Sequence, residues 1–201
     1  MRVSYYIKRR QASYTLPSVL TACEIGLPLN TFISLNFRHL GIDETEASKL
    51  NGKLKNWAYT WLKRPKKGSR YKSTPLTLMW VVENSGDVGV HWAIHLPRGA
   101  KKRFVEQLKS KIEHLYPNQV NTKTIKVKRI YNMLGLRKYF LKGMDDSVGK
   151  LFRVRTSPQG PVFGKRFGVS QNIGPSAIES LNIKKRRSAL LAKHFPTAQI
   201  S

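Results

Sequence analysis

Four short segments of the chain have the apolar or alternating pattern of β-strands, in which successive side chains point to opposite faces. They are residues 31–38, 76–83, 90–96 and 124–130. In the fourth segment the apolar side chains share one face and the basic side chains share the other. The intervening residues 84–89 include two glycines and are typical of a turn, so we expect the second and third strands to form a hairpin.

Three other segments repeat apolar residues every three or four positions, which is the spacing of an amphipathic helix. They are residues 44–63, 100–116 and 132–142. Asp43, followed three positions later by Glu46, resembles a capping box before the first helix, and Asn132 can cap the third. The first six elements follow the order of a split βαβ, ferredoxin-like layout. We therefore expect an α+β fold, with a central antiparallel sheet of four to five strands backed by helices.

The two flanking segments have no clear period. Residues 1–30 contain Pro17 and Pro28 and are expected to form an irregular N-terminal arm. Residues 31–147 hold all of the strands and helices predicted above and are expected to form one domain. Residues 148–201 are a basic C-terminal extension, for which we expect an ordered loop or extended hairpin and a short helix.

The composition adds a large positive charge to this picture. The chain of 201 residues has 37 Lys and Arg against 11 Asp and Glu, which gives a net charge of +26. Such an excess repels itself and usually persists because a polyanion neutralises it, so nucleic acid is the expected partner, ahead of an acidic membrane surface. No apolar run approaches the roughly 20 residues that span a bilayer, and we expect no membrane partner. The single cysteine, Cys23, excludes an internal disulfide and a cysteine-rich zinc cluster and favours a reducing cytoplasm.

Basic residues gather in segments whose glycines and prolines suit loops that follow a phosphate backbone. The candidates for nucleic-acid contacts are Lys63, Arg64, Lys66, Lys67, Arg70, Lys72, Lys126, Lys128, Lys165 and Arg166. The last two lie between glycines, which let backbone amides approach phosphate. RNA-binding sheets display aromatic side chains on their central strands, and Trp80 and Trp92 are partial candidates for that role.

Two histidines share one face of the predicted strand 90–96. His91 and His95 are four residues apart, roughly 13 Å along a strand, which is too far for the pair to bind one ion without other ligands. The alternative is that each histidine simply packs on the sheet or faces solvent.

A tyrosine and a lysine lie on one side of the predicted helix 132–142. Tyr139 is displayed beside Lys142, and Gly135 is expected to leave space over it. A tyrosine hydroxyl can attack a phosphodiester when it is deprotonated or held near a cation or metal. A tyrosine next to a lysine is also common on ordinary helices, so the pair by itself does not indicate a catalytic site. Other residues of such a site must accompany it.

Taken in order, the strand FISLNF, the hairpin ENSGDVGVHWAIHLP and the helix segment YFLKG resemble the HUH endonuclease superfamily. The likeness is greatest to the rolling-circle replication initiators of plasmids and phages. HWAIHLPRG, RKYFLKGMDD and PQGPVFGKRFGVSQNIGPSA are also similar to replication-protein-like sequences of bacterial mobile elements. The resemblance covers roughly residues 31–177 and implies the same split sheet, so that 31–147 would be a nucleic-acid-binding, nuclease-like domain.

The resemblance implies a metal-dependent nuclease chemistry. In the family two histidines hold a divalent ion, here Mg²⁺ or Mn²⁺, which polarises the scissile phosphate. A helix tyrosine attacks and leaves a 5′-phosphotyrosine link and a free 3′-hydroxyl. Carried over by position, Tyr139 would be the nucleophile, Lys142 its neighbouring helper and His91 a metal ligand.

The chain departs from the family's His-hydrophobic-His motif. In one alignment Gly89 stands where the first histidine belongs, and in the other Ala93 stands where the second belongs. Glu83, across the turn, or His39, just after the first strand, could complete the site, and His95 is a further candidate ligand.

The expected function is that of a replication initiator that nicks and joins single-stranded DNA. The alternative is a catalytically degenerate relative that acts as a binding module for single-stranded DNA or RNA. Single-stranded or origin-hairpin DNA is the expected partner. No G-x-x-x-x-G-K-[ST] segment occurs, so any unwinding would need a host helicase.

Overall fold

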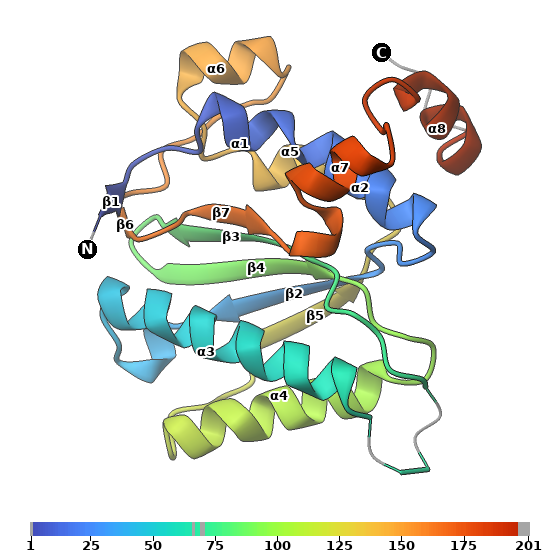
Figure 1. Cartoon of the computed structure of the whole chain (residues 1–201). Coiled ribbons are helices and arrows are strands. Elements are labelled where there is room, and N and C mark those ends of the chain that lie inside the picture. The colour runs from blue at the N-terminus through green and yellow to red at the C-terminus, as the bar shows by residue number, and fades with distance from the viewer. Residues whose placement is uncertain (1, 66, 69–70, 197–201) are drawn as a thin grey trace.

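The computed structural model describes residues 2–65, 67–68 and 71–196. Five strands form one antiparallel sheet in the spatial order β5-β2-β4-β3-β7 (Figure 1). They are β2 (Thr31–Asn36), β3 (Leu78–Asn84), β4 (Val88–Ile94), β5 (Ile125–Arg129) and β7 (Phe167–Val169). The first four of these strands have the order of the split βαβ layout, so the expected α+β fold with a central antiparallel sheet is confirmed.

Two long helices, α3 (Glu44–Lys63) and α4 (Lys101–Leu115), cover one face of the sheet (Figure 1). The side chain of Asp43 caps α3 by accepting a hydrogen bond of 2.7 Å from the backbone N–H of Glu46. Alternate strand residues point toward these helices and form the main core with them. Its fully buried members include Ile33, Leu35, Val90, Trp92, Leu50, Leu54, Phe104 and Leu108.

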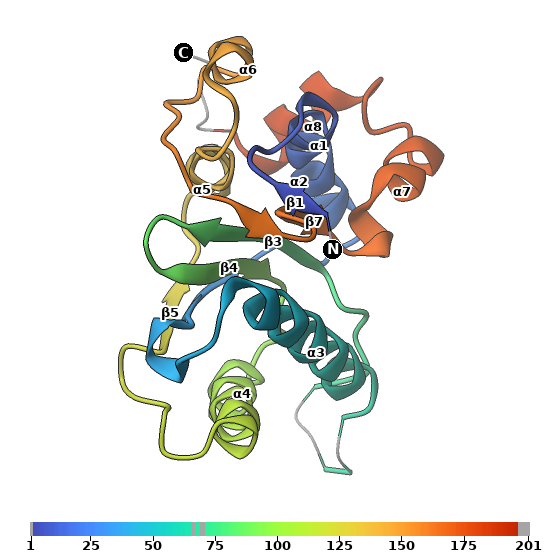
Figure 2. The ribbon, with the colours of Figure 1, turned by 90° about the vertical axis from the view of Figure 1, so that its left-hand side faces the viewer.

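The opposite face is covered by α1 (Arg9–Ser13), α2 (Thr15–Glu24) and α5 (Met133–Phe140), which lie above the sheet in Figure 2. We expected residues 1–30 to be an irregular arm, and that expectation was wrong. Pro17 lies in the first turn of α2, where its missing N–H costs nothing because the first amides of a helix have no partner within it. Pro28 follows the end of the helix.

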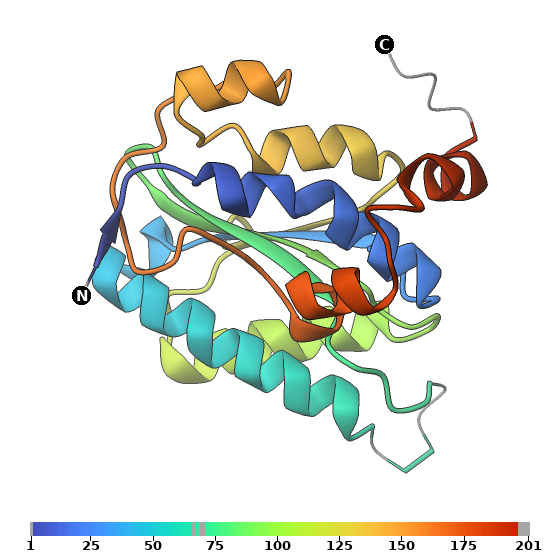
Figure 3. The same ribbon diagram turned by 45° about the horizontal axis from the view of Figure 1, so that its top comes forward.

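The C-terminal extension completes the sheet and the second layer. The strand β7 pairs with β3 and forms one edge of the sheet, and β6 (Val162–Phe163) pairs with β1 (Val3–Ser4) near the start of the chain. The helices α6 (Asp146–Leu151), α7 (Pro175–Ser180) and α8 (Arg187–His194) follow the outer surface of this layer (Figure 3). Two short 3₁₀ helices, η1 (Arg38–Leu40) and η2 (Gln171–Ile173), complete the elements.

None of the helices in the described ranges has both the length and the apolar run that crossing a membrane requires.

Candidate active site

The helix α5 places Tyr139 against the sheet. The hydroxyl of Tyr139 lies 3.2 Å from Nε2 of His91, which projects from β4. Buried Met133 and Phe140 fix the rotation of α5, since both pack into the core between this helix and the sheet. Tyr139 and His91 therefore lie on the same face of the sheet, within hydrogen-bond distance of each other.

The start of α5 explains Gly135 differently from our expectation. The side chain of Asn132 caps the helix by accepting a 2.7 Å hydrogen bond from the backbone N–H of Gly135. A Cβ atom at position 135 would lie 2.8 Å from Nδ2 of Asn132. Gly135 therefore makes room for the cap rather than for a ligand over Tyr139.

Glu83 joins the site from the neighbouring strand. Its Oε2 atom lies 3.2 Å from Nε2 of His91 and 2.8 Å from Nζ of Lys142. The register explains the contact: Glu83 pairs with Gly89 and Val81 pairs with His91, so Glu83 and His91 are diagonal neighbours on one face. The structure thus brings together Glu83, His91, Tyr139 and Lys142, a set that we call the tyrosine cluster.

His95 does not belong to the tyrosine cluster, and its assignment as a metal ligand was wrong. It follows β4 four residues after His91, and its Nδ1 atom lies 2.8 Å from the carbonyl oxygen of Pro28. An extended strand carries it roughly 13 Å from His91. His39 lies in η1, beyond the end of β2.

The charges of the tyrosine cluster depend on one another. Burial raises the pKa of Glu83, but His91 and Lys142 outweigh burial, and the pKa lies below its ordinary value. Burial lowers the pKa of Lys142, but Glu83 and Tyr139 outweigh it and raise the pKa above its ordinary value. Burial and the charge of Glu83 raise the pKa of Tyr139, and Lys142 offsets this only in part. At neutral pH the cluster therefore holds a carboxylate, an ammonium and a protonated tyrosine.

The tyrosine cluster offers two donors to a divalent ion. His91 and Glu83 are close together, and the Oε1 atom of Glu83 is buried without a hydrogen-bond partner among the described residues. Within those residues, no group of three or more His, Cys, Asp and Glu side chains is arranged to hold a metal. Mg²⁺ keeps several waters and often uses one carboxylate together with substrate phosphates, so the donors fit Mg²⁺ or Mn²⁺. They are too few for a tetrahedral zinc site.

A pocket of about 460 Å³ opens beside Tyr139 and His91. Lys126 and Lys128, two of the predicted nucleic-acid contacts, line it together with Phe32. The ring of Phe32 stacks on that of His91, with centroids 5.5 Å apart. Phe32 and Ser34 are not among the site residues predicted from the sequence, although their alternation along β2 places both on the same face as His91. The pocket joins the candidate nucleophile to a basic surface.

The other predicted phosphate contacts lie away from this pocket. Exposed Lys63, Arg64, Lys67 and Lys72 lie at and beyond the end of α3, on the other face of the sheet (Figure 1). Lys66 and Arg70 are outside the described residues. Lys165 is exposed on the segment between β6 and β7.

Arg166 is a structural residue, and its assignment as a phosphate contact was wrong. Only 1% of its surface is exposed. Its guanidinium donates to the carbonyl oxygens of Ser4, Val82, Gln159 and Gly160. It therefore joins three segments of backbone instead of facing a ligand.

The two tryptophans considered for stacking on RNA bases are also buried. Trp92 is fully buried, and its Nε1 donates to Oδ1 of Asn51 at 3.1 Å. Trp80 is 6% exposed, and the ammonium of Lys55 lies 3.9 Å from its ring centroid. Both point to the face that α3 covers, so neither is free to stack on a base.

Comparison with protein-family models, with curated proteins and with solved structures finds no match to this chain.

Proposed function

We propose that this protein nicks and joins single-stranded DNA with Tyr139 as the nucleophile, in the manner of a rolling-circle replication initiator. One observation carries the proposal: the hydroxyl of Tyr139 lies 3.2 Å from Nε2 of His91. Both side chains line a pocket with Lys126 and Lys128, which suit a DNA backbone.

The proposed reaction exchanges one phosphodiester for another. The hydroxyl oxygen of Tyr139 bonds to phosphorus, the bond from phosphorus to the 3′ oxygen breaks, and that oxygen takes a proton from solvent. When Nε2 of His91 carries no proton, it is placed to accept the tyrosine proton in the free protein. The product is a 5′-phosphotyrosine link and a free 3′-hydroxyl, and the reverse reaction joins strands. Lys142, whose Nζ lies 4.2 Å from the Tyr139 ring centroid, stabilises the negative charge that develops.

A divalent ion, Mg²⁺ or Mn²⁺, held by His91 and Glu83 would polarise the scissile phosphate. Nε2 of His91 cannot bind an ion and accept the proton of Tyr139 at the same time. If cleavage requires a divalent ion, His91 is therefore a ligand of that ion. If cleavage proceeds in the presence of a chelator, His91 is the base that accepts the tyrosine proton.

A second candidate function is binding without cleavage. Gly89 favours it, because the family's motif has a histidine at that position in one alignment, and only two donors remain near Tyr139. In that case the basic pocket would hold single-stranded DNA as a module without nuclease activity.

The proposal extends to partners and location. Single-stranded or origin-hairpin DNA would be the substrate, and a host helicase would separate the strands. The single cysteine is in keeping with a reducing cytoplasm, which is part of the same proposal.

The decisive experiment is to incubate the protein with labelled single-stranded DNA and Mg²⁺ or Mn²⁺ and to look for a covalent adduct on a denaturing gel. We expect the wild type to form the adduct and Tyr139→Phe to form none, because only the phenolic oxygen is lost. The affinity of Tyr139→Phe for DNA should stay within about twofold of wild type, because the ring and its packing remain.

Tyr131→Phe is the matched control, since Tyr131 lines the same pocket and is 85% exposed. It should form the adduct at the wild-type level. An adduct that persists in Tyr139→Phe would assign the nucleophile to another residue. Tight binding of the wild type to DNA without any adduct, with either ion, would establish the binding module instead.

A further inference from the structure

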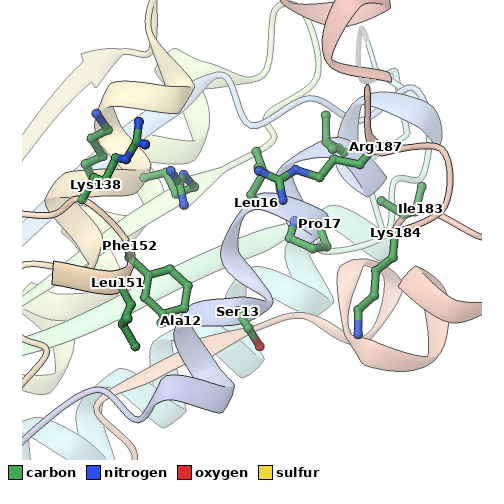
Figure 4. A pocket seen from close by; sticks show the side chains of 13 residues that line it. Ala12, Ser13, Leu16, Pro17, Lys138, Leu151, Phe152, Ile183, Lys184 and Arg187 are labelled. Atoms are coloured by element: carbon green, nitrogen blue, oxygen red, sulfur yellow. The ribbon is translucent and has the colours of Figure 1, made fainter. Parts of the chain in front are cut away.

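A second pocket, of about 680 Å³, lies beside α5 and is distinct from the tyrosine cluster. Its walls come from α1, α2 and α5, from the end of α6 and the residues after it, and from the segment that leads into the start of α8 (Figure 4). Arg137 lines it, and Tyr139 is two positions further on, about 200° around the helix axis. The two pockets therefore lie on opposite sides of α5.

The charge of this pocket has one sign. Five basic side chains and no acidic one line it: Arg137, Lys138, Arg153, Lys184 and Arg187. None of the five forms an ion pair with a carboxylate within the described residues. Nearby acids have other partners: Glu24 binds Arg186, Lys193 and His194, and Asp146 binds Lys150. We call this site the arginine pocket.

Arg137 is the group in the arginine pocket that most needs a partner. Its Nε atom is buried and has no hydrogen-bond partner in the part of the chain that the structure describes. Burial, and next the charge of Arg187, lower the pKa of Arg137. Two guanidinium groups that share a pocket without an anion repel each other. An anion between them would relieve that repulsion and accept from the unpaired N–H.

The rest of the lining indicates what the anion is attached to. Leu16, Pro17 and Phe152 form an apolar part of the wall, and Figure 4 shows Lys138 and Phe152 on one side with Lys184 and Arg187 on the other. The volume lies in the range of pockets that enclose small molecules. Guanidinium groups bind phosphate through paired hydrogen bonds, and an aromatic ring accepts a nucleobase by stacking.

We propose that the arginine pocket binds a phosphate ester of a nucleotide, with the phosphate between Arg137 and Arg187 and the base against Phe152. The site does not depend on strand cleavage by Tyr139. The ligand is either a nucleotide within a DNA strand or a free nucleotide, and both present the same phosphate ester and base.

The test uses calorimetric titration of the full chain with deoxyadenosine 5′-monophosphate at low salt. We expect the wild type to bind at one site and Arg187→Gln to bind at least about tenfold more weakly, because a charge-assisted hydrogen bond is lost. Arg187 is exposed, so its replacement should leave the fold intact. Arg137→Gln should give a similar loss, with its folding checked by circular dichroism. Lys109→Gln changes the charge equally at an exposed position of α4 and should stay within about twofold of wild type.

A second arm distinguishes the two sources of the phosphate. The same variants are titrated with an oligodeoxynucleotide that lacks a terminal phosphate. A loss of affinity in Arg187→Gln for both ligands identifies a strand phosphate, and a loss for the mononucleotide alone identifies a free nucleotide.

The proposal is overturned if Arg187→Gln and Lys109→Gln bind both ligands equally well. Adduct formation by Tyr139 is measured in the same variants. A protein that binds the nucleotide in the arginine pocket but forms no adduct with DNA contradicts the proposed nicking reaction and leaves this site standing.

Discussion

At the scale of single residues, Tyr139 is held in its neutral form. Burial and Glu83 raise its pKa above the ordinary value near 10, and Lys142 opposes them only in part. A phenol in this state is a poor nucleophile at neutral pH. Attack by Tyr139 would therefore require a base such as His91 to take the proton, because burial first and Glu83 next make ionisation of the phenol more costly.

Restoring the missing histidine should strengthen metal binding. A Cβ atom at position 89 would lie 3.4 Å from the carbonyl oxygen of Leu35, an ordinary contact, so a side chain fits there. Position 89 pairs with Glu83 and Asn36 and lies two residues before His91 on the same strand face. Gly89→His should therefore raise Mn²⁺ affinity by at least about tenfold, because it adds a third donor, as measured by titration calorimetry.

Gly89→Ala is the control for this change, since it fills the same space and supplies no donor. Its affinity for Mn²⁺ should match that of the wild type. Equal affinities in all three proteins would show that His91 and Glu83 are not metal ligands.

Neighbouring residues also show where prediction from sequence stops. Lys165 and Arg166 lie in one glycine-flanked basic pair, yet the first is exposed and the second is buried. Tyr139 and Lys142 could be found because helical spacing places them on one side of the predicted helix 132–142, although α5 ends at Phe140 and Lys142 lies in the turn that follows. Arg166 could not be assigned, because its partners Ser4 and Val82 are far away in the chain and only the tertiary fold brings them together.

At the scale of elements, α8 is attached to α2 by a few contacts. Leu190 is its buried residue and packs with Leu20. Glu24, at the end of α2, binds Arg186 at 2.8 Å, Lys193 at 3.1 Å and His194 at 3.2 Å. The position of α8, and with it one wall of the arginine pocket, is therefore set by this apolar contact and by one carboxylate that binds three basic side chains.

Acid should therefore release α8. Hydrogen bonds from Arg186, then His194 and Lys193, lower the pKa of Glu24 to about 2, from an ordinary value of roughly 4.3 in the unfolded chain. The stabilisation is complete above about pH 4.3 and is lost as the pH falls through about 2. The protection of α8 amides from hydrogen exchange, relative to the unfolded chain at the same pH, should fall in that window in the wild type. In Glu24→Gln this protection should be low already at pH 6 and change little with acid; a wild-type-like protection profile in that variant would contradict the attachment.

The elements differ in how well their sequences predict them. The long helices α3 and α4 carry Leu50, Leu54, Phe104 and Leu108 at regular helical spacing, and their bounds agree closely with the prediction. The helix α2 buries the polar residues Thr15, Ser18 and Thr21 together with Val19, Leu20 and Ala22, so polar positions interrupt the apolar stripe that would have revealed it. The strand β7 has three residues, too few to show a period, and it forms only because β3 offers an edge.

At the scale of the whole molecule, the positive charge is divided between two sides of the sheet. One set surrounds the tyrosine cluster, with Lys126 and Lys128 on β5. The other set extends from Lys63 at the end of α3. The order of β5, β2, β4 and β3 was predictable from the sequence, but which basic residues share a surface with Tyr139 depends on how α5 folds back over the sheet.

Binding to single-stranded DNA should weaken steeply with salt. If six or more phosphates are neutralised, affinity should fall by roughly 10³ or more between 50 and 200 mM salt. Replacing Lys126 and Lys128 with glutamine should reduce the salt slope by about two, because each phosphate contact contributes about one. The exposed α4 residues Lys101 and Lys109, changed in the same way, should leave the slope unchanged.

Fluorescence anisotropy at several salt concentrations measures these slopes. Equal salt slopes in the β5 and α4 double variants would show that DNA does not bind along the pocket beside Tyr139. A salt slope near zero in the wild type would exclude nucleic acid as the partner.

The pairing of β1 with β6 sets the order in which the fold can be completed. Val3 pairs with Phe163, and β3 gains β7 as its neighbour from the same late part of the chain. During synthesis β1 therefore has no strand to pair with until β6 has left the ribosome. Contacts between residues so distant in sequence also form slowly. Until residues 162–169 are made, β3 presents an open edge to other nascent chains, and the risk of aggregation is greatest in that interval.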